Sequence, residues 1–294
     1  MSANKLHPDE INIDTNLVKS LVEKQFPQWA GLPIEPIKSA GTDNVIFRLG
    51  NEMTIRLPRT IGAASNIYKE WKWLPILEQQ VSLSIPTPIS KGIQTKDYPC
   101  PWLIYKWLDG KNGTESELDL NNAAIVLGNF VKDLQKVDIS NAPFSQRGGP
   151  LSKLNNEVLE ALKNLNGIID VDKAKLAWEK ALSAPVHTGS PVWIHSDLHA
   201  GNILVNHGQI TSVIDFGMSG IGDPACDVMA AWTLLSKETR NKFREIVNVD
   251  DATWERGKGW ALSFGLIALP YYKDSNPVLA NIALRTINEV LNNN

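Results

Sequence analysis

The chain has 294 residues and a mass of 32.5 kDa, which is long enough for two compact units because single hydrophobic cores stop growing near this length. Hydrophobic residues make up 43% and charged residues 21% of the sequence, so a globular fold is expected and a disordered class is excluded. The net charge of -3 and the pI of about 6.0 give no basic footprint for nucleic acid and no polybasic membrane segment, so neither partner is expected.

The small number of cysteines and the lack of an apolar secretory segment indicate a reducing compartment. Cys100 and Cys226 are too few for a disulfide framework in a chain of this size. Residues 1–14 are polar where a secretory peptide needs an apolar core, and the longest apolar run, residues 261–270, is too short to span a bilayer. We therefore expect a cytoplasmic protein without an export route, present as a monomer or a weak dimer.

The first patterned segment is an alternation of apolar residues over residues 44–57, interrupted by the dipeptide Gly50-Asn51. This pattern predicts a β-hairpin. Because side chains alternate between the two faces of a strand, Ile46 and Arg56 are expected on the face opposite the apolar one.

A helix is predicted over residues 65–77. Its apolar stripe, at spacings of three and four residues, consists of Ile67, Trp71, Leu74 and Leu77. Glu70 is expected on a different stripe, and Pro75 is expected to kink the helix.

Residues 98–107 form an apolar and aromatic run that predicts a buried strand ending at the turn Asp109-Gly110. We place the domain boundary here, with a nucleotide-binding lobe over residues 1–105 and a mainly helical lobe over residues 106–294. Helical spacing follows over residues 120–137 and 151–165, and again from residue 227 to the end with interruptions expected near Pro270 and Pro277.

The segment of residues 193–217 carries the densest set of polar residues that could bind a metal ion or take part in a reaction. Two short apolar runs, residues 203–205 and 210–214, flank a turn-rich tetrapeptide and predict an antiparallel hairpin. If Leu204 pairs with Val213, then Asn202 lies opposite Asp215. An amide oxygen and a carboxylate at one edge suit Mg2+, which uses few protein ligands together with substrate phosphates.

Asp197 precedes Asn202 by five residues and is expected on the loop that enters this edge. There it could accept or orient the proton of an attacking hydroxyl group. Phosphoryl transfer needs this geometry, since its loose transition state calls for positioning and charge neutralisation more than for covalent chemistry.

The pattern His195-x-Asp197-x4-Asn202, followed by Asp215-Phe216-Gly217, resembles the catalytic loop and metal motif of protein kinases and their antibiotic-kinase relatives. It is most similar to the aminoglycoside and macrolide phosphotransferase family, which the stretches 70–75, 98–110 and 147–151 also resemble. The resemblance covers residues from about 41 to the C-terminus. It implies an α+β, protein-kinase-like two-lobe fold, with a small N-lobe built on an antiparallel sheet and a larger, mainly helical C-lobe.

The resemblance also assigns expected roles. Asp197 would be the catalytic base, and Asn202 and Asp215 would be magnesium ligands. Asp227 would brace the catalytic loop from a helix start, and His195 is expected to hold that loop through hydrogen bonds. Residues implied in binding the donor nucleotide, ATP or GTP, are Gly41, Thr42, Asp43, Asn44, Ile46, Arg56, Glu70, Lys106, Trp107 and Leu108.

Within that set, residues 39–44 occupy the place of a phosphate-covering loop, and Arg56 and Glu70 occupy the place of the usual lysine and its acidic partner. His199 stands where protein kinases often have a lysine near the transferred phosphate. The roles of His199 and Arg147 remain open.

The resemblance implies a small-molecule kinase whose acceptor is an antibiotic of the aminoglycoside or macrolide type or a related metabolite, with a possible link to antibiotic resistance. Two other functions remain open. One is a nucleotide-binding module of the same fold without catalysis. The other is a metal-dependent hydrolase that uses His195, Asp197 and His199 as ligands.

Overall fold

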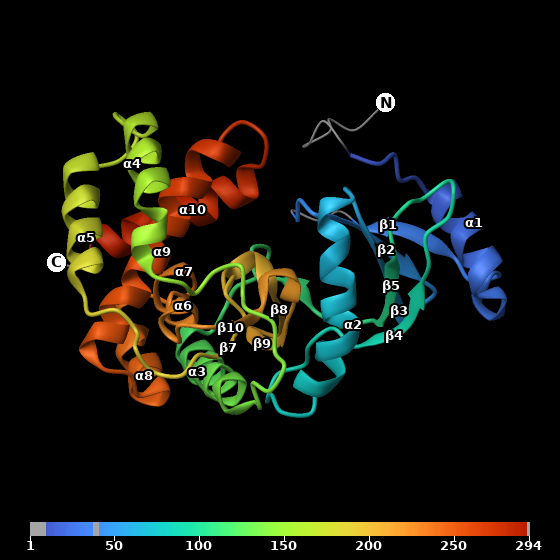
Figure 1. Cartoon of the computed structure of the whole chain (residues 1–294), viewed down its shortest axis with the longest axis horizontal. Helices are drawn as coiled ribbons and strands as arrows, with labels where there is room; N and C mark the ends of the chain where they lie inside the picture. The colour runs from blue at the N-terminus through green and yellow to red at the C-terminus, as the bar shows by residue number, and fades with distance from the viewer. Residues whose placement is uncertain (1–9, 38–40, 293–294) are drawn as a thin grey trace. The chain divides into compact units, whose positions relative to one another are not determined.

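The computed structural model describes residues 10–37 and 41–292, which divide into two compact units. Unit 1 comprises the described residues up to Gln79 together with Ile85–Leu108, and unit 2 comprises Gln80–Ser84 and the described residues from Asp109 onward. Unit 1 is built on an antiparallel sheet and unit 2 is mainly helical (Figure 1), which confirms the expected α+β, kinase-like fold.

Unit 1 contains a five-stranded antiparallel sheet with the order β1-β2-β3-β5-β4. The strands are β1 (Ile34–Ile37), β2 (Asn44–Leu49), β3 (Met53–Pro58), β4 (Pro88–Gly92) and β5 (Trp102–Lys106). The helices are α1 (Thr15–Gln25) and α2 (Ser65–Leu77), with short 3-10 turns η1 (Pro27–Trp29) and η2 (Gly62–Ala64). The predicted hairpin over residues 44–57 and the predicted helix over residues 65–77 are confirmed.

The two helices of unit 1 cover opposite faces of its sheet (Figure 1). On the α1 face, Phe47, Ile55 and Trp102 are buried together with Val18 and Val22 of the helix. Burial of such side chains provides most of the stabilisation, at about 1.5–3 kcal/mol each. This packing fixes which residues of β2 and β3 point toward α2.

Unit 2 is organised around one long helix. Its helices are α3 (Leu120–Lys136), α4 (Asn155–Asn164), α5 (Val171–Ser183), α6 (Ala225–Val228), α7 (Ala230–Thr233), α8 (Lys237–Val247), α9 (Asp251–Tyr272) and α10 (Pro277–Leu291). The 3-10 turns are η3 (Leu151–Leu154), η4 (Ala200–Asn202) and η5 (Phe216–Met218). The strands are β6 (Lys111–Asn112), β7 (Val192–Ile194), β8 (Ile203–Asn206), β9 (Gln209–Val213) and β10 (Gly220–Gly222).

Helix α9 packs against α10, α6, α5 and α4 and is buried on nearly all sides (Figure 1). Gly265 lets α10 approach closely, because a Cβ atom there would lie 2.7 Å from Ile287 Cγ1. The helical run from α9 to α10 is interrupted once, between Tyr272 and Pro277, which confirms a break in the expected region near Pro270 and Pro277. Pro270 lies in the last turn of α9, where its missing N–H removes a single hydrogen bond near the helix end. Pro277 instead begins α10, a position that tolerates proline.

The two small sheets of unit 2 support the segment of residues 193–217. One pairs β7 with β10, and the other has the order β6-β8-β9. The segment Gln80–Ser84 also belongs to this unit. Ser84 donates its N–H to Thr211 O at 3.3 Å and accepts from the Val213 N–H at 3.0 Å. In the described part of the chain, no helix combines the length and the apolar character that a membrane crossing requires.

Candidate catalytic site

The β8–β9 hairpin sets the geometry of the site. Its turn has two residues, His207 and Gly208, both with left-handed backbone (φ 48° and 76°). Such a turn matches the twist of the strands. Ladder pairing therefore starts with Asn206 opposite Gln209, and one bulge follows before Leu204 pairs with Ser212.

The expected pairing of Leu204 with Val213 is therefore wrong by one residue. The ladder that starts with Asn206 opposite Gln209 is shifted by one position at the bulge, which places Ser212, and not Val213, opposite Leu204. Ile214, and not Asp215, consequently faces Asn202, and its N–H donates to the Asn202 backbone oxygen at 2.9 Å. Asp215 follows directly and stays at the same end of the hairpin.

Asp197 and Asn202 are in direct contact. The Asn202 side-chain nitrogen lies 2.9 Å from Asp197 Oδ2 and 2.9 Å from the Asp197 backbone oxygen. His199 Nε2 lies 3.5 Å from Asp197 Oδ2 and 3.3 Å from the Asn202 nitrogen. These contacts point the amide nitrogen of Asn202 at Asp197. The amide oxygen of Asn202 accepts no hydrogen bond from residues 10–37 or 41–292 and remains available as a ligand.

His195 holds the loop as expected. Its side chain is fully buried, its Nε2 lies 3.0 Å from the Ile214 oxygen, and its Nδ1 accepts from the Asp197 N–H at 3.2 Å. Burial lowers the pKa of His195 to about 4, so the ring is neutral near pH 7 and carries its proton on Nε2. Because backbone groups occupy both nitrogens, His195 is not arranged as a metal ligand. No group of three His, Cys, Asp or Glu residues suited to a metal ion occurs in the described part of the chain, so nothing here favours the hydrolase alternative.

Asp227 braces the same loop from α6. Its carboxylate accepts the backbone N–H groups of His195 and Ser196, each at 2.7 Å, and its side chain is fully buried. Ser196 has φ 70°, an unfavourable value for a residue with a Cβ. The two hydrogen bonds hold Ser196 in this conformation and so position Asp197. The bracing geometry expected for Asp227 is confirmed.

Replacing Asp227 tests this brace. Asp227→Ala leaves two buried N–H groups without acceptors and is expected to lower the free energy of unfolding by about 1–3 kcal/mol for each. Asp227→Asn keeps one acceptor oxygen and is expected to cost less. Urea unfolding followed by circular dichroism measures both.

The same residue predicts a pH dependence. Burial raises the pKa of Asp227 to about 7 in the folded state, above its ordinary value. The folded protein then binds more protons than the unfolded chain between about pH 4 and pH 7, so its stability falls as pH rises through this window. The wild type should lose up to about 1.4 kcal/mol per pH unit relative to Asp227→Asn. Parallel curves for the two proteins between pH 5 and pH 7 would contradict this assignment.

Arg147 is the residue of the site whose role the sequence left open. Its Nη1 forms an ion pair with Asp197 Oδ1 and lies 3.2 Å from the Ser196 oxygen. Burial by itself raises the pKa of Asp197, but the Arg147 guanidinium and His199 hold it well below its ordinary value. Asp197 is therefore ionised at neutral pH. The motif Arg147-Gly-Gly-Pro was the only available signal, and it did not show which residue the arginine meets.

Asp215 has a left-handed backbone, with φ 66° and ψ 71°. Its side chain accepts from the Gly217 N–H at 3.5 Å, and Phe216 packs its ring against His195 with centroids 4.7 Å apart. A strained non-glycine residue beside a polar cluster marks a candidate functional position. Together with the amide oxygen of Asn202, the Asp215 carboxylate provides the hard oxygen donors that Mg2+ prefers.

In unit 1, Arg56 pairs with Ile46 across the β2–β3 hairpin, and both side chains lie on the face of the sheet that α2 covers, as expected. Arg56 Nη1 lies 3.2 Å and 3.3 Å from the two Glu70 oxygens. With the side-chain amide of Asn44 turned so that its oxygen faces the guanidinium, this oxygen accepts from Nη2 at 2.9 Å and from Nε at 3.0 Å. Glu70 also accepts from the hydroxyl of Tyr105. The guanidinium is therefore held from both sides.

The stripe expected for α2 is partly wrong. Trp71 is 37% exposed, whereas Glu70 is 2% exposed and lies in line with Ile67, Leu74 and Leu77. Spacings of three, four and three residues connect these four positions, so all of them face the sheet. A carboxylate on the buried stripe is tolerated because Arg56 pairs with it.

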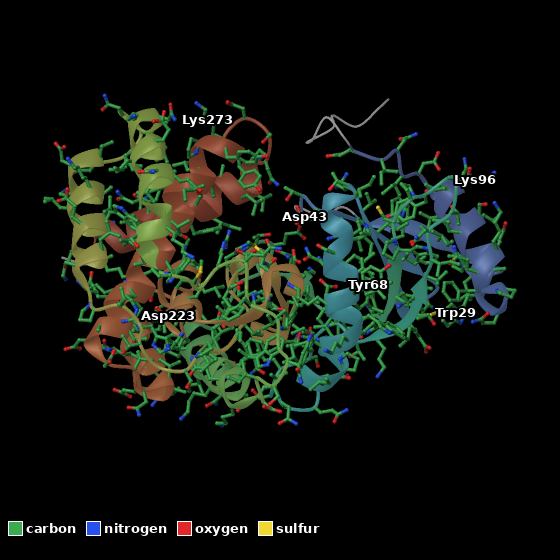
Figure 2. All side chains as sticks on the ribbon, viewed as in Figure 1. Trp29, Asp43, Tyr68, Lys96, Asp223 and Lys273 are labelled. Atoms are coloured by element: carbon green, nitrogen blue, oxygen red, sulfur yellow. The ribbon has the colours of Figure 1, made fainter. Side chains whose placement is uncertain are left out.

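The remaining nucleotide-site candidates of unit 1 lie in the loop before β2 and at the end of β5. Ser39 and Ala40 fall outside the described residues. Thr42 donates its hydroxyl to Asp43 Oδ1 at 3.2 Å, and the exposed Asp43 lies just before β2 (Figure 2). The N–H groups of Lys106 and Trp107 donate to Thr87 O at 3.0 Å and to Glu52 O at 2.7 Å. Leu108 keeps a backbone N–H without a hydrogen-bond acceptor in the described chain.

Arg56→Lys tests whether the contacts of the Arg56 guanidinium with Glu70 and Asn44 contribute to nucleotide binding. A lysine has no planar fork, so it cannot contact Glu70 and Asn44 together. We expect nucleotide affinity to fall about tenfold, equivalent to about 1.4 kcal/mol, as measured by calorimetric titration with ATP and GTP. Arg59→Lys is the matched control, since the Arg59 side chain pairs with Glu10 instead. Equal affinities for all three proteins would remove Arg56 from the nucleotide site.

Comparison with known proteins gives the following matches. The sequence pattern of the phosphotransferase enzyme family matches residues 33–260. None of the curated proteins compared with the sequence matches it.

Solved structures share the fold at low sequence identity. The GDP complex of wild-type aminoglycoside 2'-phosphotransferase-IIIa has a TM-score of 0.70 at 19% identity, covering 96% of this chain and 99% of that chain. A streptomycin and ATP ternary complex of an aminoglycoside phosphotransferase has 0.59 at 18%, covering 96% and 97%. The macrolide 2'-phosphotransferase MphH from Brachybacterium faecium has 0.59 at 18%, covering 94% and 98%.

Proposed function

The chain belongs to the phosphotransferase enzyme family, and from this premise we propose that it transfers the terminal phosphate of a nucleoside triphosphate to a hydroxyl group of a small molecule. The observation that carries the proposal is the cluster of Asp197, Asn202 and Asp215 at one end of the β8–β9 hairpin. A binding module without chemistry has no evident need for all three residues, each held by its own contacts.

Asp197 is the proposed catalytic base. The acceptor oxygen would form a bond to the terminal phosphorus while the bond from that phosphorus to the bridging oxygen of the nucleotide breaks. The proton of the acceptor hydroxyl passes to Asp197. The low pKa of Asp197 makes it a weak base, which suits a loose transition state in which the proton leaves late.

Arg56 is proposed to contact the α- and β-phosphates of the nucleotide, with Glu70 and Asn44 fixing its orientation. Gly41, Thr42 and Asp43 would cover the phosphates with their backbone N–H groups. Two further contacts are proposed for the base. Ile46 would pack against it, and the strand end at residues 106–108 would bind its edge, with the Leu108 N–H as the available donor.

Asn202 and Asp215 are the proposed ligands of Mg2+. When bound, this ion would neutralise charge on the nucleotide phosphates. Their oxygen donors fit the ion, and the two hydrogen bonds from the Asn202 amide nitrogen to Asp197 direct its oxygen away from Asp197.

We propose an aminoglycoside- or macrolide-type antibiotic, or a related metabolite, as the acceptor. The support is the family and the shared fold with aminoglycoside and macrolide phosphotransferases, whose structures hold GDP in one case and ATP in another. Either ATP or GTP is a candidate donor for the present chain.

A coupled nucleotide-consumption assay tests the proposal. The purified protein would be incubated with Mg2+ and either ATP or GTP. Aminoglycosides, macrolides, choline, homoserine and small sugars would be offered in turn as acceptors. We expect phosphorylated product, identified by its mass, with at least one acceptor. Stabilisation by nucleotide without any transfer or hydrolysis above the Asp197→Ala background would favour the catalytically inactive module.

A further inference from the structure

Only one of the three nitrogens of the Arg147 guanidinium forms hydrogen bonds within the described residues. Its Nη1 contacts the Ser196 oxygen and Asp197 Oδ1, but its Nε and Nη2 have no hydrogen-bond acceptor within residues 10–37 and 41–292. The side chain is 29% exposed, so these donors are within reach of a solute. The Nε and Nη2 groups lie along one edge of the planar fork and point in parallel, which is the geometry that binds two oxygens of a carboxylate or phosphate.

The backbone of Arg147 is fixed in place. Its N–H donates to Ser145 Oγ at 3.1 Å, and this hydroxyl donates to the Met218 oxygen at 2.8 Å. The next residue, Gly148, has φ 85°, and a Cβ there would lie 2.4 Å from Ile194 Cδ1. The Gly148 oxygen accepts from the Asp223 N–H at 2.8 Å. With this backbone fixed and Nη1 bonded to the Ser196 oxygen and Asp197, the side chain has less rotational freedom to lose when it binds.

An aromatic side chain completes the surroundings of the arginine. The ring of Phe264 on α9 lies 5.9 Å from Arg147 Cζ and stacks on His199 at 5.3 Å. Two nearby acids already have partners: Asp223 pairs with Arg256, and Asp227 binds backbone N–H groups. Asp197 occupies the Nη1 side of the Arg147 guanidinium. The Nε and Nη2 edge of the guanidinium stays open and presents positive charge.

We propose that the Nε and Nη2 edge of Arg147 binds an oxyanion beside Asp197 during the reaction. The inference rests on the proposed phosphate transfer. The oxyanion comes from one of two sources: the phosphoryl group in transfer, or an acidic group of the acceptor next to its reacting hydroxyl. In both cases the open edge of Arg147 disfavours an acceptor that carries an ammonium group directly beside its reacting hydroxyl.

The test uses Arg147→Gln and Arg147→Lys, with Arg244→Gln as a matched control. Arg244 is similarly exposed, at 34%, and pairs with an acid elsewhere in unit 2. The first measurement needs no activity: calorimetric titration of the full-length protein with inorganic phosphate at low salt. We expect Arg147→Gln to bind at least about tenfold more weakly than wild type, with Arg147→Lys in between and Arg244→Gln unchanged. Equal phosphate affinity in correctly folded wild type and Arg147→Gln would overturn the proposal.

The second measurement identifies the source of the oxyanion. If it is the transferred phosphoryl group, Arg147→Gln lowers kcat about 100-fold for every acceptor and for basal nucleotide hydrolysis, with KM for the nucleotide unchanged. If it belongs to the acceptor, hydrolysis is unchanged and KM rises for glycerate but not for glycerol.

The two measurements separate the inference from the proposed function. A wild type that binds phosphate through Arg147 but transfers none to any acceptor would refute the kinase proposal and leave the oxyanion site intact. If the wild type is active and Arg147→Gln changes neither its kinetics nor its phosphate binding, the oxyanion site is refuted and the kinase proposal is retained.

Discussion

Asp197→Asn is expected to lower kcat for phosphate transfer by about 100- to 10,000-fold, the range usual for loss of a general base. The amide keeps the size of the carboxylate and can still accept a hydrogen bond from Arg147, so the loop should stay in place. What disappears is the group that takes the acceptor proton. Steady-state transfer kinetics, with the melting temperature in the presence and absence of nucleotide, provide the measurement.

Asp170→Asn is the matched control for this variant. Asp170 caps α5, where its carboxylate accepts the Lys173 N–H at 3.0 Å, and asparagine caps a helix about as well. The control should retain wild-type kcat. Transfer by Asp197→Asn within a factor of a few of wild type would rule out Asp197 as the base and direct attention to His199.

Asp215→Asn is expected to have the second large effect. It removes the only carboxylate of the proposed metal pair and leaves two neutral amides, so charge stabilisation worth several kcal/mol is lost and kcat falls by at least about 100-fold. The Mg2+ concentration that gives half-maximal activity should rise as well. Titrations of activity and of nucleotide-dependent melting temperature with Mg2+ measure both effects.

The two aspartate variants should differ in how they respond to the metal ion. Asp197→Asn is expected to keep the Mg2+ dependence of the wild type, because its side chain is not a proposed ligand. Asp215→Asn should recover part of its activity at high Mg2+ concentration, or with Mn2+. An Asp215→Asn variant whose Mg2+ dependence equals that of the wild type would place the metal site elsewhere.

Local patterns predicted the arrangement of the candidate catalytic segment because its parts are close in sequence. Asp197, Asn202 and Asp215 are joined by one hairpin, so turn residues and alternation were enough to bring them to one end. The register was wrong by one position because alternation fixes neither the residues at which the turn starts nor the place of a bulge. The fold class followed from the resemblance to antibiotic kinases, whereas the periods of the sequence indicated only a hairpin, a helix and a mainly helical second half.

Contacts between distant segments were not predictable in this way. Arg147 meets Asp197 across 50 positions of the chain, and nothing in the arginine motif specifies that partner. Glu70 was placed on the wrong stripe because a carboxylate is assumed to face water, whereas a partner on another strand makes its burial favourable. Helices α1 and α5 were not predicted. Their buried residues recur at spacings of three and four and the aspartate caps Asp14 and Asp170 mark their starts, so local signals for both helices are present in the sequence.

The short segment Gln80–Ser84 limits how this protein can be dissected. The chain leaves unit 1 at residue 79, contributes its backbone to the edge of β9, and returns at residue 85. A fragment beginning at residue 109 would therefore expose the N–H of Val213 and the carbonyl of Thr211, two residues before the Asp215 turn. Separate expression of either half is a poor route to a working catalytic segment, whereas a circular permutant that keeps residues 80–84 connected preserves it.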